Sequence, residues 1–75
     1  MNVQKVRMFG SMALAFDDYG RVAKIEDDLF KSLIKTVARI GLKSRKREST
    51  ILRETVQNWA DADWLEWVEA GEANK

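Results

Sequence analysis

The sequence predicts a mainly helical domain with one short strand, in the order strand, helix, helix. Apolar residues recur at helical spacing over about residues 27–40 and again after residue 49, which indicates two amphipathic helices. The stretch RVAKI, residues 21–25, alternates in the manner of a short strand and directly precedes the first helix. The chain contains no proline, so neither helical segment is forced to break.

The strand at residues 21–25 needs a partner strand. A single strand cannot satisfy its own backbone hydrogen bonds. MALAF, DDYG and RVAKI could form a hairpin across a turn that contains Gly20, and the fold would then be a β-hairpin followed by two helices. The preferred interpretation is that residues 1–20 form an N-terminal arm and that RVAKI is the one strand.

The first helix is expected over about residues 27–40. Asp27 and Asp28 suit its first turn, where carboxylates meet unpaired amides and the positive end of the helix. Gly41 is placed where helices commonly end. Apolar residues at spacings of four, four and three, widened by two neighbours, form the buried face: Leu29, Leu33, Val37, Ile40, Phe30 and Ile34.

The second helix is expected to begin at Ser44 or, if the basic segment is a loop, at Ser49. Its pattern ends near Gly71, and residues 61–75 are interpreted as an acidic, helical C-terminal extension. The apolar face of this helix is formed first by Ile51, Leu52, Thr55, Val56 and Trp59, and then by Trp64, Leu65 and Val68.

The composition restricts the function. The chain has 75 residues, no cysteine and no histidine. Domains this small bury only about 60% of their unfolded surface and usually need disulfides, a metal or self-association. Without cysteine or histidine, self-association is the expected remedy. No histidine base, cysteine nucleophile or phosphate-binding glycine loop is present, so we expect no enzyme, no cofactor and no metal site.

The apolar segments are short. None approaches the roughly 18 to 20 residues of a membrane span. The apolar stretch near the N-terminus is interrupted by Gly10 and Ser11, which argues against a signal peptide. We therefore expect a cytoplasmic protein without a membrane partner.

The net charge of +1 conceals a basic middle and an acidic tail. From Lys35 to Arg47 the chain carries six basic residues and no acidic one, whereas six acids from Glu54 onward are opposed only by Lys75. Cations at the start of the second helix oppose its dipole, so helix stability does not explain them. A polyanion is the expected partner of the basic segment.

The segments VAKIEDDLFKSLIKTVARIG and STILRETVQNW resemble the ribbon-helix-helix DNA-binding family over about residues 22–59. The similarity lies in the order of strand, acidic cap, L-x-x-x-L helix, closing glycine, and a Leu-Arg-Glu run followed by an aromatic. It implies that residues 21–60 form the DNA-binding domain of an intertwined homodimer. Strands from two chains would pair as an intermolecular two-stranded antiparallel ribbon that enters the major groove of double-stranded DNA.

The resemblance also implies the DNA contacts. With Ala23 and Ile25 facing the helices, alternation turns Val22 and Lys24 toward the bases. A register shift of one residue would exchange Val22 for Arg21. The second helix of this family directs its N-terminus at a phosphate, which assigns that contact here to Lys43, Ser44, Arg45, Lys46, Arg47 and Ser49.

The expected function is that of a homodimeric transcriptional repressor, acting at operator sites near its own gene and forming cooperative assemblies there. Three alternatives remain. The first is an antitoxin whose tail binds a toxin, with Trp64 and Trp67 as the contacts to that protein. The second is a plasmid partition or conjugation accessory protein that binds DNA. The third is a small helical inhibitor that binds proteins and no DNA.

Overall fold

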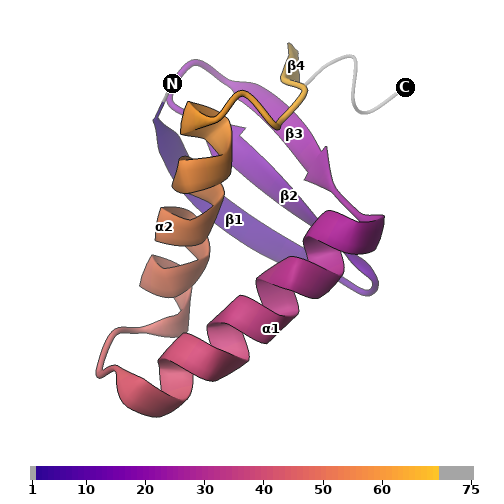
Figure 1. Cartoon of the computed structure of the whole chain (residues 1–75). Coiled ribbons are helices and arrows are strands. Elements are labelled where there is room, and N and C mark those ends of the chain that lie inside the picture. The colour runs from indigo at the N-terminus through magenta and orange to yellow at the C-terminus, as the bar shows by residue number, and fades with distance from the viewer. Residues whose placement is uncertain (1, 70–75) are drawn as a thin grey trace.

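The computed structural model describes residues 2–69. Three strands in sequence are followed by two helices and a short final strand (Figure 1). The elements are β1 (Val3–Phe9), β2 (Met12–Asp17), β3 (Arg21–Ile25), α1 (Asp27–Lys43), α2 (Glu48–Asp61) and β4 (Val68–Glu69). Among the described residues, neither helix is long and apolar enough to cross a membrane.

The strands form one antiparallel sheet in the order β1-β2-β3-β4. The β1–β2 turn contains Gly10, with a φ angle of 55°, and the β2–β3 turn contains Gly20, with a φ angle of 80°. Glycine adopts this backbone region without the steric cost that a Cβ atom brings, which permits the two tight hairpins. The register of β1 is shifted between Val3 and Lys5 by a bulge.

The predicted fold class is therefore wrong. The order is β-β-β-α-α, and β3 pairs with β2 of the same chain instead of with a second chain. On its other edge, Arg21 and Val22 pair with β4. β3 is therefore not the unpaired strand that the expected intermolecular ribbon requires. Residues 12–25 do form a hairpin, but the alternative with two strands is also wrong because β1 adds a third.

The segment expected to be an arm, residues 1–20, contains all of β1 and β2. In VQKVRMF, Val6 and Met8 face the core while Lys5 and Arg7 are exposed, which is the alternation of a half-buried strand. Each of these residues also has a β2 partner. Pairing with β2 satisfies the backbone groups that an isolated arm would expose to water.

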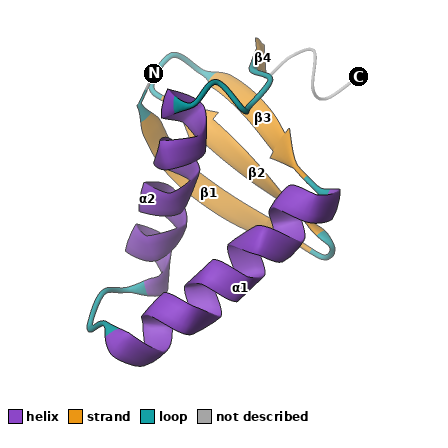
Figure 2. Cartoon of the chain, in the orientation of Figure 1, coloured by secondary structure: helices purple, strands orange, loops and turns teal. Residues whose placement is uncertain are grey.

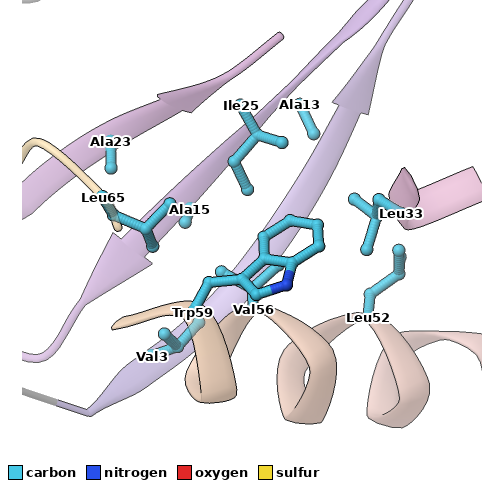
Figure 3. Packing of buried hydrophobic residues seen from close by; sticks show 10 residues of the cluster. All are labelled: Val3, Ala13, Ala15, Ala23, Ile25, Leu33, Leu52, Val56, Trp59 and Leu65. Carbon is cyan, nitrogen blue, oxygen red and sulfur yellow. The ribbon is translucent and has the colours of Figure 1, made fainter. Parts of the chain in front are cut away.

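Both helices pack on the same face of the sheet (Figures 1 and 2). Three alanines at the centre of that face, Ala13, Ala15 and Ala23, are fully buried and allow close approach of the helices. The indole of Trp59 lies among these inner residues (Figure 3). The buried cluster consists of Val3, Ala13, Ala15, Ala23, Ile25, Leu33, Leu52, Val56, Trp59 and Leu65.

The helix boundaries differ from the prediction at three points. Helix α1 continues through Gly41 to Lys43, because the backbone of an unhindered glycine can remain helical at modest cost. Helix α2 begins at Glu48, next to the second of the two expected starts. It ends at Asp61, where the amides of Asp63 and Trp64 bond back to carbonyls of the last turn.

The C-terminal extension is consequently not helical where it is described. Asp63 adopts a left-handed φ of 61°, which terminates α2, and residues 68–69 form β4. Leu65 turns back into the core, whereas Trp64 is exposed. Residues 70–75 of the expected extension lie outside the described residues.

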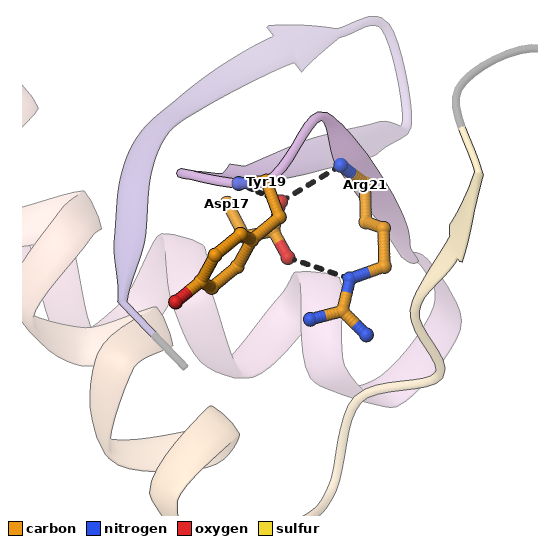
Figure 4. Close-up of polar contacts among 3 residues, drawn as sticks. All are labelled: Asp17, Tyr19 and Arg21. Carbon is orange, nitrogen blue, oxygen red and sulfur yellow. Dashed lines mark hydrogen bonds and ion pairs between the residues drawn. The ribbon is translucent and has the colours of Figure 1, made fainter.

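The β2–β3 turn is held by the buried carboxylate of Asp17 (Figure 4). Its Oδ1 atom accepts hydrogen bonds from the backbone amides of Tyr19 at 2.9 Å and Arg21 at 2.7 Å. Its Oδ2 atom accepts from Nε of Arg21 at 2.9 Å. Burial acts to raise the pKa of Asp17, but these donors and the positive charge of Arg21 outweigh it, so the pKa lies below its ordinary value.

Candidate nucleic-acid interface

The candidate site is the outer face of the sheet, opposite the helices. Because strand side chains alternate, each residue between two inward-facing ones points to this side. Within residues 2–69, no helix covers it (Figure 1). The outer face consists of Lys5, Arg7, Phe9, Met12, Leu14, Phe16, Val22, Lys24 and Val68.

The strand register arranges these side chains in rows across the sheet. In one row Arg7 and Lys24 lie on either side of Leu14. In the next, Lys5 and Phe16 are neighbours, and Val22 follows on β3. The third row pairs Phe9 with Met12 beside the β1–β2 turn. Cations thus occupy β1 and β3, the two strands on either side of β2, and apolar side chains occupy β2 between them.

The Lys5 ammonium group lies over the Phe16 ring, with its Nζ atom 5.1 Å from the ring centroid. This cation–π contact holds the lysine over the middle of the outer face. It also occupies one face of the Phe16 ring, so that face is not open to a stacked base.

The electrostatic character of the outer face is uniform. Three of its nine side chains, Lys5, Arg7 and Lys24, are cationic and none is acidic. Within residues 2–69, the ion pairs Arg21–Asp17 and Lys46–Glu54 involve none of these three. Exposed cations beside apolar side chains form a surface suited to a partner with closely spaced negative charge and apolar groups.

The predicted base-contact residues lie in different environments. Lys24 is exposed on the outer face, but Val22, although it is on the same face, is buried beside its sheet neighbours Phe16 and Val68. Arg21 belongs to the opposite side of β3 and is bound to the carboxylate of Asp17. Of the three, only Lys24 is exposed to a ligand of the outer face.

The predicted phosphate-contact residues form the connection between the two helices and the start of α2. Lys43, Arg45, Lys46, Arg47 and Ser49 are exposed, and Ser44 is half-buried. Lys46 forms an ion pair of 2.9 Å with Glu54. This segment is separated from Lys24 by α1, whose 17 residues span about 25 Å. The structure therefore does not bring the two predicted contact regions together (Figure 1).

The sequence interpretation missed most of the outer face. Lys5, Arg7 and Phe9 were assigned to an arm, and Leu14 and Phe16 received no functional role. The alternation of charged and apolar residues in VQKVRMF is the signal that could have identified them. Cationic residues at the alternate positions 5 and 7 of one strand predict a charged face as soon as the strand itself is recognised.

The remaining candidates for a functional site are metal-binding side chains and the tryptophans near the C-terminus. Among residues 2–69, no group of three or more histidine, cysteine, aspartate or glutamate side chains could hold a metal ion. Trp64 is exposed, Trp67 is half-buried against the core, and neither lies in the sheet face described above. Comparisons of the chain with protein-family models, curated proteins and solved structures find no match.

Proposed function

We propose that this protein binds double-stranded DNA through the outer face of its sheet and acts in the cytoplasm as a transcriptional repressor of its own gene. The observation that supports binding is the arrangement of Lys5, Arg7 and Lys24 around an apolar central strand. The repressor role is the function expected from the sequence, now with a different DNA-binding element in place of the ribbon.

The dimensions of the face suit the major groove. Neighbouring strands lie about 4.8 Å apart, so the axes of β1 and β3 are about 10 Å apart; the side chains of the outer face, and not the three-stranded sheet itself, would enter a groove about 12 Å wide. Arg7 and Lys24 would then reach guanine edges or phosphates on the two sides. Leu14, between them, would contact a thymine methyl group.

The same geometry favours duplex DNA over single strands. Proteins that bind single strands stack bases on exposed aromatic rings. Only two aromatic side chains belong to the outer face, and Lys5 covers one side of Phe16. Phe9, which is 44% exposed, lies at the end of the sheet beside the turn. Continuous stacking of several bases across this face is therefore unfavourable.

Fluorescence anisotropy tests the proposal. The purified protein is titrated onto labelled duplex from upstream of its own gene, with scrambled duplex and the single strands as comparisons. Each cation that neutralises a phosphate should contribute about 0.9 to the slope of log affinity against log salt. Arg7→Ala and Lys24→Ala should each weaken binding, by roughly 5- to 150-fold if a bidentate base contact is lost.

Lys31→Ala is the matched control, because Lys31 is exposed on α1 and does not belong to the sheet. It should bind DNA like the parent protein. The double variant Arg45→Ala/Arg47→Ala tests the helix connection separately. Equal affinity of the parent, Arg7→Ala and Lys24→Ala proteins would exclude the outer face as the DNA site. Equally weak binding of upstream and scrambled duplex would exclude autoregulation.

A further inference from the structure

One side of α1 is only partly covered within the described part of the chain. Phe30, Ile34, Val37 and Gly41 follow one another at spacings of four, three and four, which places them on one stripe of the helix, named here the α1 shoulder. Ile34 is 45% exposed and Gly41 is exposed, while Phe30 and Val37 are only partly covered by the core. An apolar stripe of this kind is typical of a helix–helix interface.

The charge changes sign between the start of α1 and the segment at its end, where Lys43 is the last helical residue and Arg45, Lys46 and Arg47 belong to the connection that follows. Residues 26–28 are Glu, Asp and Asp, whereas residues 43–47 contain four cations and no acid. Two α1 helices in antiparallel orientation would place each acidic start beside the basic end of its partner. A parallel orientation would bring like charges together at both ends. The charge pattern is therefore complementary to a second copy of itself.

The side-chain sizes along the shoulder fit the same arrangement. If the two-fold axis passes between Ile34 and Val37, Ile34 of each chain meets Val37 of the other. Phe30 then meets Gly41, so the largest side chain of the stripe faces the position without one. A Cβ atom added at Gly41 would have no neighbour within 4 Å in the single chain, which leaves space there for the partner's ring.

We propose that the protein forms a homodimer through antiparallel pairing of its α1 shoulders. The apolar contact spans residues 30–41, about 17 Å along the helix. Lys35 and Arg39 lie about 100° and 140° around the helix axis from Ile34, so they remain outside the contact, whereas Lys31, about 60° from Ile34, lies at its border. This interface is independent of the DNA-binding proposal, because it uses no residue of the outer sheet face.

Sedimentation equilibrium of the DNA-free protein, from micromolar to millimolar concentration, tests the dimer. The parent protein should approach twice its 8.6 kDa monomer mass. Ile34→Lys should weaken association by about tenfold or more, because it places a cation in the apolar contact. Ser32→Lys introduces the same side chain at an exposed position on the opposite side of α1 and should associate like the parent.

Circular dichroism of both lysine variants verifies that the monomer is folded, which is expected because both positions are exposed. The orientation is tested by mixing Gly41→Cys protein with Phe30→Cys protein in a chain that has no other cysteine. Under oxidising conditions the mixture should form a covalent heterodimer, and each variant alone should not. A parent protein that remains monomeric at every concentration would overturn the proposal, as would equal association of the Ile34→Lys and Ser32→Lys variants.

Discussion

Replacement of Asp17 by asparagine tests a buried carboxylate that accepts three hydrogen bonds. The Asp17 side chain is fully buried and accepts hydrogen bonds from two backbone amides and from the Arg21 guanidinium. Asparagine retains an oxygen for the amides of Tyr19 and Arg21. Its Nδ2 group, however, would present a second donor to Nε of Arg21, so the ionic hydrogen bond is lost.

The expected cost follows from the bond that is removed. A hydrogen bond to a charged group contributes about 1.5–3 kcal/mol. A 75-residue domain has a total stability of roughly 4–11 kcal/mol, so Asp17→Asn should remove a substantial fraction of it. For a domain of this size, the melting temperature should fall by about 4–8 °C for each kcal/mol lost.

The dependence on pH provides the sharper test. Because the pKa of Asp17 is lowered in the folded protein, its ionised form stabilises the fold above the unfolded-state pKa of about 3.9. That contribution is lost as the pH falls through the lower, folded-state pKa. The stability difference between the parent and Asp17→Asn should therefore be constant near neutral pH and shrink at pH values below about 3.9.

Urea unfolding followed by tryptophan fluorescence measures this difference, since Trp59 reports directly on the core. Asp18→Asn, at the exposed neighbouring position, is the matched control and should change stability by less than about 0.5 kcal/mol. A cost for Asp17→Asn as small as that of the control would refute the reasoning. So would a cost that persists unchanged at the lowest pH at which the protein folds.

Two further substitutions test the packing and the end of α2. Leu33→Ala should lower the free energy of unfolding in urea by about 2–5 kcal/mol, because Leu33 is the one α1 side chain of the described residues that is fully buried in the core. A decrease of less than about 1 kcal/mol would contradict the packing of α1. Asp63→Gly should stabilise the protein by about 0.5–1 kcal/mol, since Asp63 holds a left-handed φ of 61°. Asp63→Val should destabilise it, and the opposite order of the two variants in thermal unfolding would contradict this helix ending.

Both helices could be predicted from the sequence because apolar residues recur at helical spacing over a long segment of each. The sequence did not identify where α1 ends, because Gly41 is a frequent terminator but is also tolerated within a helix when its surroundings are open. It also extended α2 too far. Leu65 continues the helical spacing, but it reaches the core after a turn at Asp63, and periodicity alone does not distinguish these two routes.

The sheet was harder to predict for a physical reason. A strand is stabilised by a neighbour that is distant along the chain, so its identity depends on pairing more than on local preference. β1 has three polar or charged residues among its first five and was interpreted as an arm. Once β1 pairs with β2, the same charges become one side of a cationic face. Because β1 was not predicted as a strand, the candidate site on the outer face was not predicted either. Only Lys24 was correctly placed on an exposed strand surface.

The two proposed surfaces lie on opposite layers of the molecule, so a dimer contact through one would leave the other free to bind DNA. Because α1 belongs to the helical layer, pairing through its shoulder leaves the outer face of each sheet uncovered (Figure 1). A dimer would then present two cationic faces, each able to contact DNA without help from the other chain. Such an arrangement predicts affinity for paired sites through effective concentration instead of through a shared groove contact. The ribbon expected from the sequence differs in kind, because strands of two chains would together form one DNA-binding element. A protein of that type would lose DNA binding when its dimer dissociates.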